Sequence, residues 1–177
     1  MDALVFILIA AVRLLVPLSI FRWPFWGGLA CIAADAFDSV IQDATGIHPL
    51  EGHYHNFDKA YDIYYLAFEA WVASGWLDPL ARYTALTLFG LRLLAVLLFE
   101  VTDVRGLFLI GPNIFENFFL FIAGMKTIDP AYRVTSRLQL AAIVLFVGVP
   151  KVLQEYVMHY REAATWEFVK ENILQWR

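Results

Sequence analysis

The sequence predicts an all-α protein, a polytopic membrane bundle of about six transmembrane helices with a C-terminal amphipathic helix at the membrane surface. The chain is 60% hydrophobic and 17% charged, whereas a soluble domain is usually about 45–50% apolar and about 25% charged. Its mean hydropathy is +0.62. These values, with apolar segments that recur at the length of a membrane crossing, indicate one integral membrane domain, residues 1–177.

Six segments are long and apolar enough to be the spans. The first has neither the basic leader nor the cleavage site of a secretory signal, so we interpret it as a retained helix. Short connections join the spans except at Asp43–Asn56, which contains Gly46, Pro49 and Gly52 and cannot be one continuous helix. The predicted spans are Ala3–Ile20, Phe25–Gln42, Phe57–Trp76, Ala81–Phe99, Leu107–Met125 and Leu138–Val157.

Two features refine the last third of the chain. Pro112 lies inside the fifth span, where we expect it to kink the helix and free a backbone carbonyl. From Tyr156 onward, apolar residues such as Trp166, Ile173 and Trp176 recur at helical spacing among charged ones. This pattern predicts an amphipathic helix that lies on the membrane surface.

Charge and cysteine content restrict the function. The formal net charge of −4 does not suggest a nucleic-acid binder. Cys31 is the only cysteine, which excludes an intramolecular disulfide and a cysteine-only metal site. Lysine and arginine divide almost evenly between the two predicted sides, so the orientation stays open. We expect a multi-pass protein of the cell inner membrane in contact with membrane lipids, and the sequence leaves a homodimer open.

Four aspartates lie where lipid would penalise them. Asp35 and Asp38 come late in the second span, and Asp58 and Asp62 open the third. A carboxylate at a helix centre in lipid costs about 2.5–3.5 kcal/mol on insertion scales. Spacings of three and four residues place each pair on one helical face. Because consecutive spans cross in opposite directions, the hairpin should bring all four carboxylates to one layer near one membrane surface.

Tryptophans mark the other end of the same hairpin. Trp23 and Trp26 precede or open the second span, and Trp71 and Trp76 close the third. Tryptophan is favoured at the membrane–water interface. We therefore expect these four residues at the interface opposite the acidic layer.

The aspartate pattern resembles a known family. The residues Asp35-Ala-Phe-Asp38 and Asp58-Lys-Ala-Tyr-Asp62 form D-x-x-D … D-x-x-x-D across two adjacent spans. This is similar to the signature of the CDP-alcohol phosphatidyltransferases, D-x-x-D-G-x-x-A-R … G-x-x-x-D-x-x-x-D. The family's other motif residues are replaced, by Ser39, Gln42 and Asp43 after the first pair and by Tyr54 before the second.

The resemblance implies a divalent-metal-dependent phosphotransferase of lipid metabolism. Asp35, Asp38, Asp58 and Asp62 would bind Mg²⁺ or Mn²⁺, which prefer hard oxygen ligands. Asp62 would in addition act as the general base toward an alcohol. The replaced residues lie where the family accommodates its cytidine nucleotide, so the substrate can differ.

Other polar residues lie near the acidic layer, and the histidine pair among them has two interpretations. His53 and His55, beside Asp58, could bind Zn²⁺ or iron, although a wet loop without a ligand explains them more simply. Arg92 is a natural counter-ion for the acidic cluster, and Glu100 ends the fourth span on the same side.

Two further acids lie deeper. Glu69 follows Asp62 by two turns toward the membrane middle, where it could extend a polar pathway for ions or protons. The simpler expectation is an ion pair with Arg13 or Arg92. Glu116 has the same two interpretations. The phenylalanine-rich run 115–121 should be a packing or lipid-facing surface.

Three hypotheses follow from these observations. The first is a metal-dependent membrane enzyme of phosphoalcohol transfer, or a diverged relative of such an enzyme. The second is a catalytically inactive scaffold of the same fold, with its aspartates paired to arginines. The third is a small transporter whose acidic cluster binds a translocated cation.

Overall fold

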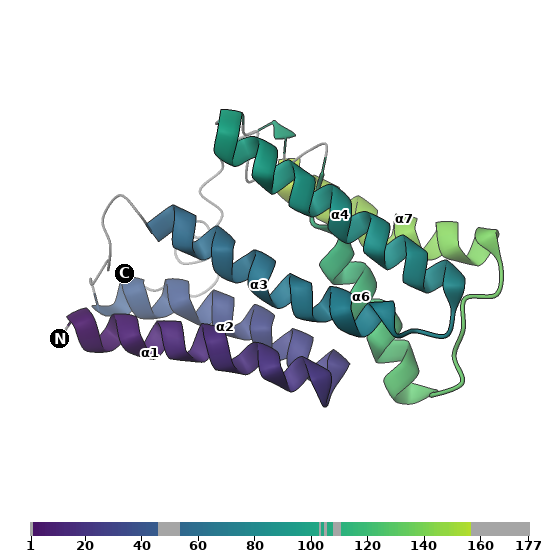
Figure 1. Ribbon diagram of the computed structural model, residues 1–177, viewed down its shortest axis with the longest axis horizontal. Helices are drawn as coiled ribbons and strands as arrows, with labels where there is room; N and C mark the ends of the chain where they lie inside the picture. Colours follow the sequence, from purple (N-terminus) through teal and green to yellow (C-terminus); the bar gives the residue numbers. More distant parts are fainter. Residues whose placement is uncertain (1, 46–53, 103, 105, 108–110, 157–177) are drawn as a thin grey trace.

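The described part of the chain is entirely helical (Figure 1). The computed structural model describes residues 2–45, 54–102, 104, 106–107 and 111–156. Within them lie six α-helices, one 3₁₀ helix and no strand, which confirms the all-α prediction. Their bounds are α1 Asp2–Leu15, η1 Val16–Phe21, α2 Pro24–Thr45, α3 Tyr54–Ser74, α4 Pro79–Thr102, α6 Ile114–Ile128 and α7 Arg137–Glu155.

Helix α6 lies at the centre of the arrangement. It contacts α2 and α3 on one side and α4 and α7 on the other. Helices α1, α2 and α3 lie along one another and alternate in direction, and α4 and α7 form the opposite part of the molecule (Figure 1). The first three helices therefore bring Arg13, Asp35 and Asp62 together near the middle of α2 and α3.

The core explains why α6 is central. Phe115, Phe118, Phe119 and Ile122 on this helix are fully buried. A helix that is apolar on most of its surface is covered by neighbours or by lipid. The packing role predicted for the phenylalanine-rich run is thus confirmed for these three phenylalanines.

Local sequence fixes several helix ends. Asp78 caps α4, because its Oδ1 accepts hydrogen bonds from the backbone N–H groups of Leu80 (3.0 Å) and Ala81 (3.2 Å). Its Oδ2 accepts a third bond from the N–H of Val134, at 2.6 Å. Ser136 caps α7 through the N–H of Gln139. The buried Asp78 carboxylate thus has three backbone donors and also ties the start of α4 to the segment before α7.

A glycine lets α2 approach the preceding 3₁₀ helix. A Cβ atom added at Gly27 would lie 2.6 Å from the backbone nitrogen of Ile20 and 2.8 Å from the carbonyl carbon of Ser19. Real Cβ atoms do not come this close to other heavy atoms, and both partners are backbone atoms that cannot move aside. The close contact sets the position of α2 beside η1 and, through η1, beside α1.

Within the part of the chain that the structure describes, two helices are long and apolar enough to cross a membrane. They are α4, with a hydropathy of 1.9, and Arg137–Gln154 of α7, with 1.4. Only 17% of either apolar window is buried inside the molecule. The core helix of a soluble protein would be mostly covered, so the exposed apolar faces favour a membrane association.

The fifth predicted span begins later than expected. It was placed at Leu107–Met125 with a kink at Pro112, but α6 begins at Ile114 and Pro112 lies ahead of it. Proline cannot donate a helical hydrogen bond, and it disfavours helical geometry at the residue before it. The prediction of a kinked helix was therefore wrong, because the Gly111-Pro112-Asn113 segment precedes the helix.

The four tryptophans differ in burial. Trp23, Trp26 and Trp71 are exposed, whereas Trp76 is buried, with its ring stacked on Phe119 at a centroid distance of 5.7 Å. Their position at a membrane interface stays a prediction. The loop residues 46–53 and the predicted amphipathic helix of residues 157–177 lie outside the described residues.

Candidate acidic site between the first three helices

Three helices bring one arginine and two aspartates together. Arg13 of α1 donates from Nη2 to Oδ1 of Asp35 on α2 and to Oδ1 of Asp62 on α3, the latter at 3.2 Å. The Arg13 side chain is 4% exposed, whereas those of Asp35 and Asp62 are 46% and 30% exposed. The two carboxylates thus converge on one point, and solvent reaches that point from their side.

The other two aspartates continue the same layer outward. Asp38 lies one turn after Asp35 on α2, and Asp58 lies one turn before Asp62 on α3. Because α2 and α3 run in opposite directions, both positions are nearer to the end of the hairpin. The structure therefore brings Asp35 and Asp62 together as predicted. The side chains of Asp38 and Asp58 lie outside the described part, so their contribution stays a prediction.

Arg13 is the residue that sequence analysis assigned to the wrong partner. It was expected as a partner of Glu69, whereas it bridges Asp35 and Asp62, and its guanidinium lies 5.3 Å from the ring centroid of Tyr61. The available signal was an arginine inside an apolar helix, which needs a carboxylate or a polar cavity. Several carboxylates met that condition, and choosing among them required the register of α1 against α2 and α3.

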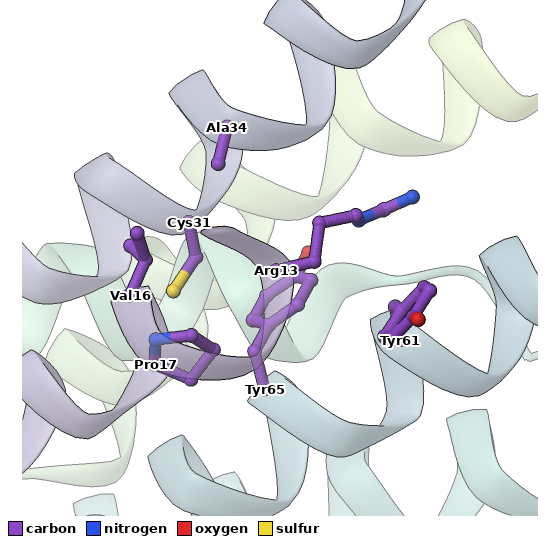
Figure 2. Close-up of a pocket in the computed structure, with 7 residues that line it drawn as sticks. All are labelled: Arg13, Val16, Pro17, Cys31, Ala34, Tyr61 and Tyr65. Carbon is purple, nitrogen blue, oxygen red and sulfur yellow. The ribbon is translucent and has the colours of Figure 1, made fainter. Parts of the chain in front are cut away.

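A small pocket lies beside Arg13, the residue that Asp35 and Asp62 contact (Figure 2). Its volume is about 10 Å³, which is room for about one water molecule. A nucleotide cannot enter a space of this size. The pocket is lined by Arg13 of α1, Val16 and Pro17 of η1, Cys31 and Ala34 of α2, and Tyr61 and Tyr65 of α3.

A second polar cluster lies beyond this pocket. Tyr65 on α3 donates its hydroxyl to Oε1 of Glu116 on α6 (2.5 Å), and Asn113 donates from Nδ2 to Oε2 of the same carboxylate (3.0 Å). Sequence analysis did not single out Tyr65 as a site residue. A buried tyrosine usually finds a partner for its hydroxyl, and this rule was the signal for the link.

Glu69 belongs to the same inner region. It is 0% exposed, and neither of its carboxyl oxygens has a hydrogen-bond partner within the described part of the chain. The expected ion pair of Glu69 with Arg13 or Arg92 was therefore wrong. Arg92 is buried and donates from Nη1 to the carbonyl of Gly111 at 3.5 Å. The guanidinium that bridges Asp35 and Asp62 belongs to Arg13, not to Arg92, which was the expected counter-ion.

The remaining candidate residues are placed only in outline. Glu100 is exposed near the end of α4. His55 lies in the first turn of α3, with its side chain outside the described part, and His53 lies outside the described residues altogether. Among the residues searched, no group of three or more His, Cys, Asp or Glu side chains could hold a metal ion. That search does not reach the side chains of Asp38 and Asp58.

Comparison with known proteins adds no assignment. No protein-family model matches the chain, and neither a curated protein nor a solved structure matches it. Functional inference therefore depends on the acidic layer and its surroundings.

Proposed function

We propose that the chain is a multi-pass membrane enzyme of phosphoalcohol transfer, whose aspartate layer binds Mg²⁺ or Mn²⁺. The observation that supports it is the convergence of Asp35 and Asp62, from two helices, on one nitrogen of Arg13. Two carboxylates that meet at one guanidinium nitrogen are arranged as the hard oxygen ligands of a divalent cation would be.

The fit of a divalent ion depends on charge as well as on donor type. Arg13 supplies one positive charge to the carboxylates of Asp35 and Asp62, and Asp38 and Asp58 follow one turn outward. A layer of four aspartates and one arginine keeps a surplus of negative charge. When bound, the divalent ion would neutralise phosphate charge and stabilise the oxygens at the transferring phosphorus.

The residues of the chain have separate roles in this proposal. Asp38 and Asp58, at the outer level of the layer, would hold the ion where a substrate arrives from the membrane surface, together with Asp35. Arg13 orients the inner carboxylates of Asp35 and Asp62 through its two contacts. Asp62 would accept the proton of the attacking alcohol, in line with the family resemblance.

A membrane location supports this assignment. Helices α4 and α7 carry apolar side chains outward, and similar exposed residues lie on α1 and on η1. We propose that all six helices cross the membrane. Two shorter apolar segments, Ile7–Phe21 and Pro24–Phe37, would be the membrane-embedded parts of the first two crossings. Lipid substrates would then reach the layer from its own membrane surface.

A non-catalytic scaffold is the second candidate, and the Arg13 contacts favour it. An arginine that already bridges Asp35 and Asp62 can serve a purely structural role, and a pocket of about 10 Å³ offers no room for a nucleotide. The two candidates differ in whether the layer binds a divalent ion at all.

Mn²⁺ binding to the purified protein separates the two candidates. We expect wild-type protein to bind Mn²⁺, measured by electron paramagnetic resonance, and Asp38→Asn and Asp58→Asn each to weaken binding at least about tenfold. The matched control is Asp129→Asn, an exposed aspartate after α6. Equal binding by all four proteins, or no binding by wild type, would reject the enzyme in favour of the scaffold. Transfer activity with CDP-alcohols and other phosphoalcohols then identifies the substrate.

A further inference from the structure

The inner cluster contains more hydrogen-bond acceptor oxygen atoms than hydrogen-bond donors. The Glu116 carboxylate accepts two hydrogen bonds, from Tyr65 and from Asn113. The Glu69 carboxyl group accepts none from the described residues, and neither does Oδ1 of Asn113. All three side chains are buried. A buried polar group without a hydrogen bond costs about 1–3 kcal/mol by mutational data, and an ionised one costs more.

The position of Glu69 explains how its carboxyl group reaches this region. A Cβ atom added at Gly28 on α2 would lie 2.9 Å from Oε1 of Glu69. It would also lie 2.7 Å from Cδ2 of Leu120, which is one turn after Glu116 on α6. The absence of a side chain at Gly28 thus leaves space for the Glu69 carboxyl group at the junction of α2, α3 and α6.

The charged groups around Glu69 do not balance it. Glu116 on α6 acts on it electrostatically and has the same sign. The guanidinium of Arg13, which lines the adjoining pocket, is bound to Asp35 and Asp62. Among the described residues, the groups besides Glu69 itself that act electrostatically on Cys31, Tyr65 or Glu69 are Arg13 of α1, Asp62 of α3 and Glu116 of α6. On α4, which packs against α3 and α6, the buried Arg92 donates to the carbonyl of Gly111.

We propose that Glu69 and Glu116 form a buried binding site for one monovalent cation, either a proton or Na⁺, on the inner side of Tyr65. A proton would convert the Glu69 carboxylate to the neutral acid. Na⁺ would instead be held by the oxygen atoms of both carboxylates, which are hard ligands. Either ion supplies the single positive charge that the region lacks.

The pocket beside Arg13 lies between the acidic layer and the inner cluster along α3. Arg13, which contacts Asp35 and Asp62, lines it, and so do Cys31 and Tyr65. Glu69 follows Tyr65 by one turn on α3, and Gly28 precedes Cys31 by almost one turn on α2. The pocket therefore lies about one helical turn from Glu69, and an ion attracted by Asp35 and Asp62 would enter from that side. This site is separate from the divalent-ion layer and does not depend on it.

The test is a Na⁺ titration of thermal unfolding, with choline chloride to keep the ionic strength constant. If Na⁺ binds, the unfolding midpoint of wild-type protein rises by about 3–6 °C for each tenfold increase above the dissociation constant. Glu69→Gln removes the negative charge and keeps the volume, so it should abolish this rise. Asp129→Asn is the control and should retain it.

If the cation is a proton, infrared spectroscopy detects it. Wild-type protein at neutral pH then shows the C=O stretch of a protonated carboxylic acid, which Glu69→Gln removes and Asp129→Asn leaves in place. Where the Gln variant does not fold, Glu69→Met replaces it. Wild-type protein that shows neither a Na⁺-dependent midpoint nor a carboxylic-acid band overturns the proposal without any variant.

Discussion

The outer and inner acidic clusters both consist of carboxylates, but they differ in burial and in the charge of their hydrogen-bond donors. In the outer layer, Asp35 and Asp62 are partly exposed and converge on the guanidinium of Arg13. In the inner cluster, Glu69 and Glu116 are buried, and only neutral donors contact Glu116. The difference shows that burial alone does not determine how a carboxylate is satisfied.

A third carboxylate gives a reference for both clusters. Asp78 is as buried as Glu116, yet three backbone N–H groups bind its two oxygen atoms. Charge-assisted bonds of this kind are about twice as strong as those between neutral groups. Asp78 therefore needs no cation, the outer layer has a guanidinium, and Glu69 has neither. This ranking makes Glu69 the residue most dependent on a bound ion.

The largest effect is expected when the outer cluster loses its guanidinium. Arg13→Met leaves Asp35 and Asp62 facing each other, and we expect it to destabilise the fold by about 2–3 kcal/mol. Breaking a fully buried pair costs about 3–5 kcal/mol, and the partial exposure of these two aspartates lowers that value. Unfolding in detergent measures the loss, and Arg133→Met, at an exposed position, is the control.

The same variant sharpens the distinction between enzyme and scaffold. If the layer binds divalent ions, Mn²⁺ should restore much of the stability of Arg13→Met, because the ion takes over the charge of the guanidinium. It should have little effect on Arg133→Met. An Arg13→Met variant that is as stable as wild type without Mn²⁺ would show that the observed contacts contribute little.

A medium effect is expected at the inner cluster. Tyr65→Phe removes the hydroxyl that donates to Glu116 and leaves a buried carboxylate short of one donor. We expect a loss of about 1–3 kcal/mol. Tyr64→Phe is the matched control, since the Tyr64 hydroxyl makes an exposed bond of 3.3 Å to the carbonyl of Leu14. Equal losses for both variants would contradict the buried role of Tyr65.

Sequence reasoning was most accurate where hydropathy and proline set the helix ends. The second span was predicted at Phe25–Gln42 and is α2, Pro24–Thr45, with proline at its first position, where its missing N–H costs nothing. The hairpin of α2 and α3 also brought Asp35 and Asp62 together as predicted. These features depend on local composition and on the alternation of crossing direction.

The contacts between distant helices could not be predicted in the same way. The bond from Tyr65 to Glu116 joins residues 51 positions apart, and it depends on α6 packing against both α2 and α3. Likewise, the sequence offers several carboxylates as partners for Arg13, but it does not give the register of α1 against α2 and α3 that decides among them. The buried oxygen atoms of Glu69 became apparent only when the neighbours of α3 were known.

The smallest effect concerns the space that Glu69 occupies, and its sign is informative. Replacing glycine by alanine within a helix usually stabilises it by about 0.5–1 kcal/mol. Gly90→Ala on α4 should show this gain, because nothing lies within 4 Å of the added Cβ atom. At Gly28 the added Cβ would meet Glu69 Oε1 and Leu120 Cδ2, and overpacking costs about 1–3 kcal/mol. Both contacts are ends of flexible side chains, so we expect a net loss of about 1 kcal/mol.

Thermal unfolding of Gly28→Ala and Gly90→Ala measures the difference in stability. The unfolding midpoint of Gly28→Ala should also respond more weakly to the cation. A gain at Gly28 equal to that at Gly90 would mean that the Glu69 carboxyl group moves away at no cost, and therefore that α2 does not hold it in place.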